Sequence, residues 1–573
     1  MKKGIISEAT SRNWKRLRSK KSGRLMARAN KQLSTKSILP LEYFSNKDNI
    51  ADIQRFVGFC KEQNYKVEEV LYTVGLKLLE DAEIIDKPHV AAALRTLKPL
   101  TPLRALMPLL IMPPLPKDER DLLGLLYQCF LLEGEKNRKG SYYTPYAVAK
   151  NMVAGLDFSK KQTFFDPCCG SGAFIMALEG ASPNQIFACD NDPVAVMITK
   201  INMLLKFKDE VFEPQIVCCD YLKQRFKSDE TYISYDYIIS NPPWGAVLYD
   251  EKGNQITIRE SFSYFFEKAF SQLKNDGLIR FLLPESVLNV KTHKDFRKFL
   301  LENTDIQSIT LYDGTFSGVQ TKYIDIESKR TRRALSQRDE IIITSWDKVC
   351  LIHKEEKIKK SLFYLTNNLN FNLLSDSDLE IVKKILSKGK YTLNDSVWGL
   401  GIVTGDNKKH LKTKQGKGFE PIYTGKEIEA YNLKSPKYFI KYKRADYQQV
   451  AKDDIYRAEE KLVYKFISKN LVFAYDDSRS LVLNSANVLI PRIPGMSVKT
   501  VLAFLNSSTF KFLYKSLFGE IKILKGNLME LPFPEISVET DKKLTELVDK
   551  VLNGNKEAIK KIDSEIETIF GVM

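Results

Sequence analysis

Short apolar runs alternate with helical patterns along the middle of this 573-residue chain, from about residue 135 to residue 350. Apolar runs bounded by turn-forming residues predict buried strands at Thr163–Phe165, Ile186–Cys189, Ile216–Cys219, Tyr237–Ile239 and Gly277–Pro284. An apolar stretch of helical type, Ile175–Leu178, follows the first of them. Strands that alternate with helices predict an α/β domain with a doubly wound sheet. Ligands of such sheets bind beyond the carboxyl ends of the strands, where the strand order reverses.

The regions on either side of this domain have different patterns. Residues 48–134 are predicted to be helical and to serve as a scaffold. Apolar residues are spaced on one helix face at Ile53, Phe56, Val57 and Cys60. Beyond Glu355, short strand and turn pieces and a C-terminal helix predict a mixed α+β domain. The pieces are Trp398–Gly405, Tyr423–Lys426, Leu505–Ser508 and Leu531–Pro534.

A glycine-containing turn joins the first predicted strand to its helix, and it reads Asp166-Pro-Cys168-Cys-Gly170-Ser-Gly172. Its glycines let the backbone turn sharply and approach a ligand. Asp190 ends the next strand, about 20 residues further on, where an acid is placed to bind ribose hydroxyls. The turn has neither the spacing of a dinucleotide fingerprint nor the Gly-Lys-Ser/Thr ending of a P-loop. We therefore expect a cofactor with a ribose and no phosphate, which favours S-adenosylmethionine; a turn without a ligand is the alternative.

The strand Tyr237–Ile239 leads into Asn241-Pro242-Pro243-Trp244. Two consecutive prolines fix the backbone and remove two amide donors. The side-chain carbonyl of Asn241 and the backbone carbonyl of Pro242 are then left to accept hydrogen bonds, and Trp244 offers a flat ring beside them. This combination suits a planar amino group, with acceptors for its protons and a ring for its face. A proline-stiffened turn without such a role is the alternative.

This motif resembles the Asn-Pro-Pro-aromatic motif of methyltransferases that modify exocyclic amino groups, above all adenine-specific DNA methyltransferases. Upstream, Gly140-Ser-Tyr-Tyr143-Thr144-Pro145 is similar to the motif that opens the catalytic domain of the gamma type, where the Thr region contacts the methionine part of the cofactor. Taken by itself, this segment predicts a helix capped by Thr144 with Pro145 at its first position. The order of the motifs is also that of the gamma type.

The resemblance implies a Rossmann-like domain that methylates the N6 amino group of adenine in a specific double-stranded DNA sequence by base flipping. Asp220 would receive the adenine amino group of the cofactor, with the ring of Tyr221 nearby. Phe316 resembles the later aromatic residue that faces the flipped base. The first and fourth strands would meet where the strand order reverses, with Asp166 and Asn241 on opposite sides of one crevice. A cognate restriction endonuclease or another subunit is an expected partner.

The composition favours a polyanionic partner. The net charge of +17 suggests nucleic acid, although a solvated basic surface would give the same balance. Basic residues crowd residues 1–47, which we expect to form a flexible or DNA-ordered arm. The eight cysteines lack disulfide or zinc-site spacing, which favours a reducing cytoplasm and no metal. A chain that acts on DNA there is expected to associate with the nucleoid. Neither a signal peptide nor a membrane span is expected.

Together these patterns predict four parts: a basic arm at 1–47, a helical region at 48–134, a methyltransferase domain at 135–354 and a target-recognition domain at 355–573. Three alternatives stay open. The chain could methylate RNA or a protein glutamine, although its entry motif and its large basic C-terminal half argue against this. It could be the modification part of a bifunctional restriction enzyme. It could also be a DNA-binding protein with an inactive catalytic fold, which the intact Asn241, Asp166, Gly170 and Asp190 argue against.

Overall fold

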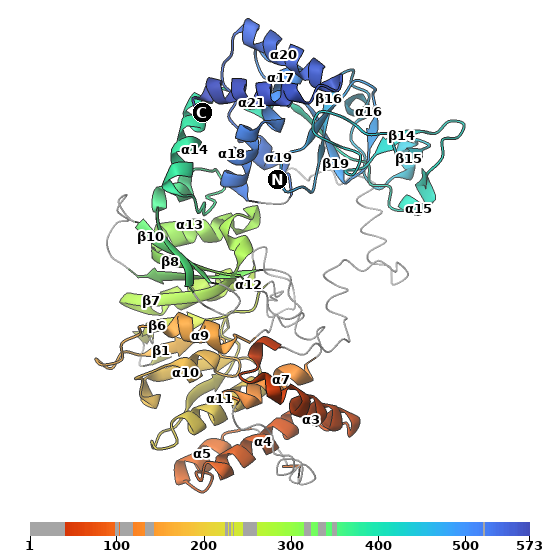
Figure 1. Cartoon of the computed structure of the whole chain (residues 1–573). Coiled ribbons are helices and arrows are strands. Elements are labelled where there is room, and N and C mark those ends of the chain that lie inside the picture. The colour runs from red at the N-terminus through yellow and green to blue at the C-terminus, as the bar shows by residue number, and fades with distance from the viewer. Residues whose placement is uncertain are drawn as a thin grey trace. The chain divides into compact units, whose positions relative to one another are not determined.

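The computed structural model describes residues 41–97, 102–103, 119–131, 143–223, 227–228, 231–232, 234–244, 260–313, 322–330, 340–346, 352–519 and 522–572. They form two compact units that divide between Lys360 and Ser361 (Figure 1), close to the predicted domain boundary after residue 354. Most of the predicted basic arm, up to residue 40, lies outside the described residues. Within the described part of the chain, no helix combines the length and apolar character needed to cross a bilayer.

A nine-stranded sheet with the order β11-β10-β8-β9-β7-β6-β1-β2-β3 forms the centre of the first unit. Its strands are β1 (Phe164–Asp166), β2 (Ile186–Asp190), β3 (Gln215–Cys218), β6 (Tyr235–Ser240), β7 (Leu273–Pro284), β8 (Asp305–Tyr312), β9 (Tyr323–Lys329), β10 (Glu340–Trp346) and β11 (Ile352–Lys359). Among the described strands, β4 (Lys227–Ser228) and β5 (Thr231–Tyr232) pair with each other and not with this sheet. The five strands predicted from apolar runs are confirmed as β1, β2, β3, β6 and β7, with small differences at their ends.

The strand order reverses at β1, as expected. Strand β1 lies between β2 and β6 and is parallel to both. From β1 the chain continues to β2 and β3 on one side, whereas β6 and β7 extend the sheet on the other side. Strand β6 is the fourth strand of this sheet along the chain, so the first and fourth strands meet at the reversal. The loops that leave the carboxyl ends of β1 and β6 therefore diverge and leave room for a ligand.

Helices cover both faces of this sheet. Helices α9 (Tyr146–Val153), α10 (Ala173–Ala177) and α11 (Pro193–Lys206) pack with Phe164 in one hydrophobic cluster. The adjacent Phe165 points to the other face, where it stacks on Tyr235. Helix α12 (Ser261–Ser271) packs against β7, and α13 (Lys294–Asn303) packs against β8. The two sets of crossover helices thus make the doubly wound arrangement that the alternation of strands and helices predicts.

The N-terminal helices pack onto the same body. They are α3 (Ile50–Glu62), α4 (Val67–Asp81), α5 (Pro88–Arg95) and α7 (Leu122–Phe130), of which α4 and α7 pack against α11 (Figure 1). The four apolar residues predicted to share a face of the first helix are all buried in α3. Helix α4 approaches α11 so closely that a Cβ at Gly75 would lie 2.6 Å from Ile201. These helices therefore share one core with the sheet domain instead of forming a domain of their own.

The second unit combines two small sheets with helices. The sheets have the orders β12-β19-β16-β17 and β13-β15-β14-β18. Their strands are β12 (Val397–Leu400), β13 (Leu411–Lys412), β14 (Glu420–Tyr423), β15 (Tyr438–Ile440), β16 (Lys461–Lys465), β17 (Phe473–Asp476), β18 (Leu481–Val482) and β19 (Ala486–Ile490). The helices are α14 (Asp376–Lys388), α15 (Asn407–His410), α16 (Asp453–Tyr456), α17 (Val498–Asn506), α18 (Ser508–Phe518), α19 (Lys525–Leu528), α20 (Val538–Leu552) and α21 (Glu557–Phe570).

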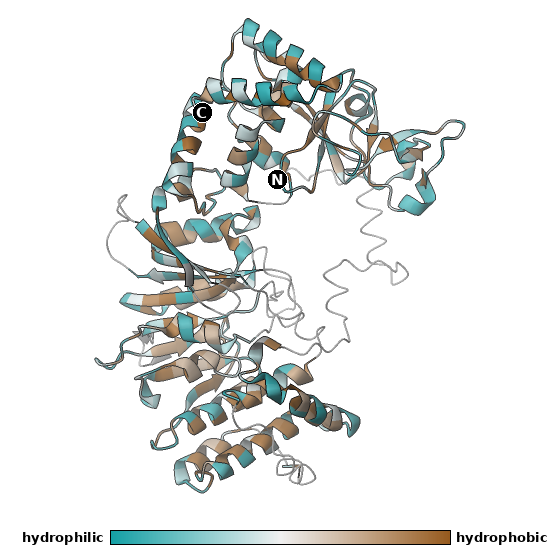
Figure 2. Ribbon diagram, viewed as in Figure 1, coloured by the Kyte–Doolittle hydropathy of each residue, from teal (hydrophilic) through white to brown (hydrophobic). Residues whose placement is uncertain are grey.

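The longer helices of this unit are amphipathic, and Figure 2 shows hydrophilic and hydrophobic residues along each of them. The predicted strand at Trp398 is confirmed as part of β12. The interpretation of Leu505–Ser508 as a strand or turn piece is wrong in its main part, because α17 and α18 are consecutive helices that meet at Ser507. Ser507 caps α18 by accepting a hydrogen bond from the backbone N–H of Phe510, which is why the Asn-Ser-Ser sequence looks like a turn.

A buried charge network connects α9 to the sheet. Arg280 on β7 donates through Nε to Oδ1 of Asp325 on β9 at 2.7 Å. Its Nη1 donates to the backbone carbonyls of Asn151 and Met152 near the end of α9, at 3.1 and 3.3 Å. The hydroxyl of Tyr312 donates to the other carboxylate oxygen of Asp325 at 2.7 Å. Arg280 therefore donates to backbone carbonyls in the last turn of α9, where a helix runs short of its own N–H donors; of the two, the carbonyl of Asn151 also accepts from the N–H of Ala154.

Replacing Arg280 with Met should lower the free energy of unfolding by about 3–5 kcal/mol, because it leaves Asp325 as an uncompensated buried charge. Urea unfolding of the full chain measures this change. The control is Arg479→Met, which removes an exposed ion pair with Glu459 at 3.0 Å. That loss should amount to less than about 1 kcal/mol. Equal effects of the two substitutions would contradict the role of Arg280.

Candidate active site

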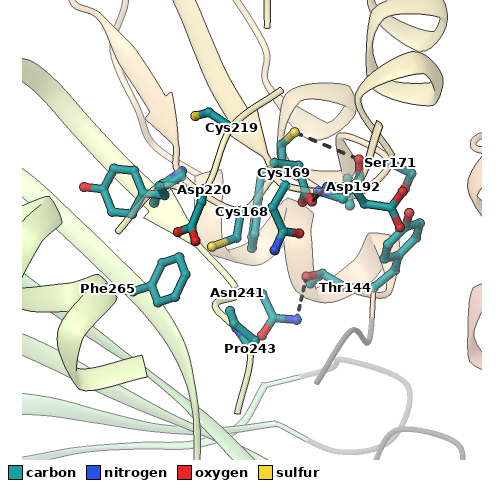
Figure 3. Close-up of a pocket in the computed structure, with 18 of the residues that line it drawn as sticks. Thr144, Cys168, Cys169, Ser171, Asp192, Cys219, Asp220, Asn241, Pro243 and Phe265 are labelled. Atoms are coloured by element: carbon teal, nitrogen blue, oxygen red, sulfur yellow. Dashed lines mark hydrogen bonds between the residues drawn. The ribbon is translucent and has the colours of Figure 1, made fainter. Parts of the chain in front are cut away.

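A cavity of 320 Å³ lies at the carboxyl ends of β1, β2, β3 and β6 (Figure 3). This volume is at the lower end of the range typical of small-molecule sites. The predicted site residues that line it are Tyr143, Thr144, Cys168, Gly170, Asp190, Asp220, Tyr221, Asn241 and Pro243. Four others lie in the same loops without lining the cavity: Asp166, Gly172, Pro242 and Trp244. Phe316 lies outside the described residues.

The glycine turn adopts a backbone conformation that favours glycine. Gly170 has a φ of 55° and Gly172 a φ of 85°, which are left-handed values. A Cβ at Gly170 would lie 3.0 Å from the ring of Tyr143, so the turn also passes close to the entry segment. Gly172 directly precedes α10 and allows that helix to begin at the cavity wall. The two glycines thus shape this side of the cavity.

Asp190, the predicted ribose-binding acid, also holds two loops in place. Its Oδ2 accepts a hydrogen bond from the backbone N–H of Gly170 at 2.9 Å, and its Oδ1 accepts one from the N–H of Asp192 at 2.9 Å. Burial raises the pKa of this carboxyl group. A carboxylate has about four acceptor positions. Asp190 therefore retains acceptor capacity toward the cavity that it lines.

Asp166 lies behind the cavity wall and bridges β1 and β6. It is fully buried, and its Oδ1 accepts hydrogen bonds from Ser240 Oγ at 2.7 Å and from the N–H of Cys168 at 3.0 Å. Among the described residues, nothing donates to its Oδ2. Ser240 directly precedes Asn241, so this carboxyl group links the glycine turn to the Asn-Pro-Pro segment. The structure gives Asp166 this bridging position, and the contact with the cofactor expected from the sequence stays a prediction.

The Asn-Pro-Pro-Trp segment closes the opposite side of the cavity. The Nδ2 of Asn241 donates to Oγ1 of Thr144 at 3.3 Å (Figure 3). Ser261 Oγ donates to the carbonyl of Pro243, whereas no described residue donates to the carbonyl of Pro242. The indole N–H of Trp244 donates to the carbonyl of Leu282 on β7 at 3.1 Å, which fixes the orientation of the ring.

The predicted cap of the entry helix is wrong. Helix α9 begins at Tyr146, Pro145 is its N-cap, and no side-chain hydrogen bond caps it. Thr144 therefore lies one residue too early to cap the helix, and its hydroxyl accepts the hydrogen bond from Asn241. A proline at the cap position is compatible with this start, because the first backbone N–H groups of a helix have no partner within it. Thr144 is thus a residue of the cavity wall.

Aromatic rings form a third side of the cavity. The ring of Phe265 on α12 stacks on Tyr221, with the ring centroids 5.6 Å apart and the planes at 25°. The hydroxyl of Tyr221 donates to Gln272 at 2.5 Å, and Lys268 Nζ lies 4.6 Å from the centroid of its ring. Phe265 is not among the site residues predicted from the sequence. In the sequence it cannot be distinguished from Phe262 and Phe266, which lie on the same aromatic-rich helix and are fully buried.

The described residues that line the cavity are acidic as a group. They include three aspartates, Asp190, Asp192 and Asp220, and neither Lys nor Arg. Such a lining disfavours a phosphate group and suits a ligand with positive charge and hydroxyl groups. This agrees with the expectation of a cofactor that has a ribose and no phosphate.

Comparison with known proteins identifies the family. Residues 118–363 match the model of the N-6 DNA Methylase family. M.VspI, a type II methyltransferase of Vibrio sp. (strain 343), is 31% identical over 318 residues, which cover 53% of this chain and 74% of M.VspI. The chain belongs to the N-6 DNA methylases. It is an adenine-specific DNA methyltransferase of the class found in restriction-modification systems.

Further comparisons extend this result to the second unit. Residues 420–533 of the methylase match the TaqI-like C-terminal specificity domain. The EcoEI methylase subunit of the type I restriction enzyme from Escherichia coli is 27% identical over 233 residues, or 36% of this chain and 46% of that subunit. The type IIL restriction-modification enzyme MmeI, solved in complex with DNA, covers 92% of this methylase and 96% of its own chain with a TM-score of 0.62. At 13% identity, that likeness concerns the fold.

The buried carboxyl group of Asp166 predicts a pH dependence of stability in the methylase. Burial raises its pKa from 3.8 to about 7. Because the folded-state pKa is the higher one, the folded chain binds more protons than the unfolded chain, and the stability contributed by this group falls as the pH rises from about 4 to 7. The unfolding free energy of the wild type minus that of Asp166→Asn should therefore fall by up to about 4 kcal/mol between pH 4 and pH 8, because the wild type loses this stability as the pH rises. A difference that is independent of pH would contradict this assignment.

Proposed function

We propose that this methylase transfers a methyl group from S-adenosylmethionine to the N6 amino group of an adenine that is flipped out of a specific double-stranded DNA sequence. The observation that carries the proposal is the position of Asn241, in a proline-fixed segment at the end of β6, on the wall of an acidic cavity. This position puts hydrogen-bond acceptors for an amino group beside the cofactor cavity.

The residues of the cavity fit S-adenosylmethionine. That cofactor carries a sulfonium and an ammonium group, a ribose and an adenine ring, and it supplies an activated methyl group when bound. The lining is rich in aspartate and has no Lys or Arg among the described residues, which suits its positive charges, and the acceptor capacity of Asp190 suits ribose hydroxyls. Phe265 and Asp220 line the same cavity and would bind the adenine ring, with its amino group toward the carboxylate.

The role of Asn241 and Pro242 is to activate the target amine. The lone pair of an adenine amino group is delocalised into the ring, which makes the nitrogen a poor nucleophile. Acceptance of its two protons by the side-chain carbonyl of Asn241 and the backbone carbonyl of Pro242 would favour a tetrahedral nitrogen and free the lone pair. The prolines keep these acceptors fixed, so the transition state is stabilised without reorganisation. Fixed positions for both reactants contribute further.

The second unit would bind the DNA. Exposed lysines gather on and beside β13 and β15 of its small sheet, namely Lys409, Lys412, Lys414, Lys417, Lys437, Lys441 and Lys443. Lysines at such positions suit contacts with phosphates, which hold the protein on the duplex while other groups read the bases. The match to a specificity domain supports recognition of a defined sequence. The name of the EcoEI relative, a methylase subunit of a restriction enzyme, supports a partner nuclease or another subunit.

Incubation of the chain with S-adenosylmethionine carrying a labelled methyl group distinguishes the candidate substrates. We expect label in duplex DNA, at the N6 position of adenine, and none in RNA or protein. Label in RNA or in a protein glutamine instead would overturn the proposal. Cleavage of plasmid DNA in the presence of magnesium would indicate a bifunctional restriction enzyme.

Replacing Asn241 with Ala should lower kcat for methyl transfer by at least about a hundredfold, the loss typical of a fixed hydrogen-bonding group that acts in the transition state. The dissociation constant for S-adenosylmethionine, measured by calorimetry, should change little. Asn553→Ala at the end of α20 is the control and should methylate DNA like the wild type. Turnover of the Asn241 variant near the wild-type rate would reject the catalytic role.

Trp244 should hold the flipped base by its ring, so Trp244→Ala should weaken kcat/KM by about ten- to a hundredfold, the value of one base–aromatic stacking contact. Trp244→Phe keeps a ring and removes the indole N–H that donates to Leu282, so its effect should be much smaller. Fluorescence of 2-aminopurine at the target position reports the extruded base independently of turnover. Equal losses in the two variants would show that stacking is not the function of Trp244.

A further inference from the structure

Helix α7 lies outside the sheet, yet one of its faces contacts the loops that form the cofactor cavity. The face consists of Asp121, which caps the helix, together with Gly124 and Tyr127. Their spacing of three residues places them on the same side of a helix. All residues of α7 are buried. The segment that contains α7 was predicted to be a scaffold, with no role for these three residues.

Asp121 fixes the middle of the glycine turn. Its Oδ1 accepts hydrogen bonds from the N–H of Gly124 and from Nδ2 of Asn202, both at 2.8 Å. Its Oδ2 accepts a hydrogen bond from the hydroxyl of Ser171, which lies between the two glycines. Asn202 also donates to the backbone carbonyl of Ser171 at 3.0 Å. Both the side chain and the backbone of Ser171 are therefore held by residues that do not line the cavity.

Gly124 allows this close approach. A Cβ at this position would lie 2.5 Å from Oγ and 2.6 Å from Cβ of Ser171. The same Cβ would lie still closer to Oδ2 of Asp121. Contacts this short do not occur between real side chains, so a larger residue here would displace Ser171 of the glycine turn, the Asp121 carboxylate that binds it, or the helix. The glycine thus sets the distance between α7 and the cavity wall.

Tyr127 holds the loop after β2. Its hydroxyl donates to Oδ2 of Asp192 at 2.6 Å, and Oδ1 of Asp192 accepts the N–H of Val194 at the start of α11. The Tyr127 ring also lies against the ring of Tyr143 in the entry segment, with the centroids 6.0 Å apart. One helix face therefore contacts three separate segments of the cavity wall: the glycine turn, the loop of Asp192 and the entry segment.

We propose that Asp121, Gly124 and Tyr127 are positioning residues that hold these three segments in the arrangement that binds the cofactor. The proposal rests on the proposed function, because it assumes that S-adenosylmethionine occupies the cavity. Loops fixed before binding lose less conformational freedom when the ligand arrives, so their fixation increases affinity. Loss of a contact made by α7 should then raise the dissociation constant for the cofactor without removing any group that touches it.

Tyr127→Phe tests this with the smallest change, because it removes the hydroxyl and keeps the ring beside Tyr143. We expect the dissociation constant for S-adenosylmethionine, measured by calorimetry on the full chain, to rise on the order of tenfold. The KM for the cofactor should rise similarly while kcat changes little. Tyr237→Phe is the matched control, because it removes a hydroxyl that donates to the carbonyl of Asp157 at 2.8 Å, away from the cavity. Its dissociation constant should equal that of the wild type.

Gly124→Ala provides a second, independent variant. It should raise the dissociation constant more than Tyr127→Phe, because it displaces the glycine turn. Gly58→Ala in α3 is its control, since a Cβ at Gly58 has nothing within 4 Å. Thermal unfolding without ligand separates effects on the fold from effects on the cavity.

If both Tyr127→Phe and Gly124→Ala bind S-adenosylmethionine with wild-type affinity, the positioning role is overturned and the proposed function is left intact. The same holds if these variants lose thermal stability but keep that affinity. Failure of the wild-type chain to bind S-adenosylmethionine would overturn the proposed function, and this inference with it. A higher dissociation constant and cofactor KM in Tyr127→Phe, with wild-type values in Tyr237→Phe, would support the inference.

Discussion

The hydrogen bonds of one buried carboxyl group hold the two sides of the cavity together. Asp166 ends β1 and accepts from Cys168 in the glycine turn and from Ser240 at the end of β6. These strands are neighbours at the point where the strand order reverses, so their loops diverge immediately beyond this contact. A cleft between diverging loops has no backbone pairing of its own to fix its width. The Asp166 carboxyl group supplies that connection, and burial favours its neutral form by raising its pKa to about 7.

The two sides of the cavity that these loops form are held in different ways. One side, formed by the glycine turn and Asp190, is shaped by left-handed glycines and by backbone hydrogen bonds to carboxylates. The other side, Asn241 to Trp244, is stiffened by its two prolines and by the hydrogen bonds of Pro243 and Trp244 to α12 and β7. Charge is divided as well. The chain has 88 Lys and Arg residues, yet none is among the described residues that line the cavity. The cavity therefore disfavours phosphates, while the exposed lysines of the second unit suit them.

Much of this arrangement could be predicted from the sequence, because buried parallel strands have continuous apolar runs in their sequences. The five predicted strands and the acids and glycines that follow them lie where the pattern indicates. The errors have local physical causes. Thr144 looks like a helix cap because Pro145 follows it, but the proline itself occupies the cap position. Phe265 was missed because a stacking ring and a core ring have the same sequence pattern. Leu505–Ser508 looked like a turn because a serine cap between two helices has turn composition.

The contacts of α7 were beyond sequence reasoning for a different reason. Asp121 meets Ser171 and Tyr127 meets Asp192 across long stretches of chain, and no periodicity encodes such pairs. The burial of helix α7 can be predicted from its sequence, since a helix that is apolar on all sides is expected to lie in a core. The sequence does not show that the polar residues of this helix contact a cavity wall. It also does not show that Gly124 allows the helix to approach Ser171 of the glycine turn closely. The region that matches the N-6 DNA methylase family begins at residue 118, ahead of α7, and not at the first strand of the sheet. The matched region thus includes α7 together with the glycine turn and the loop of Asp192 that its polar face contacts.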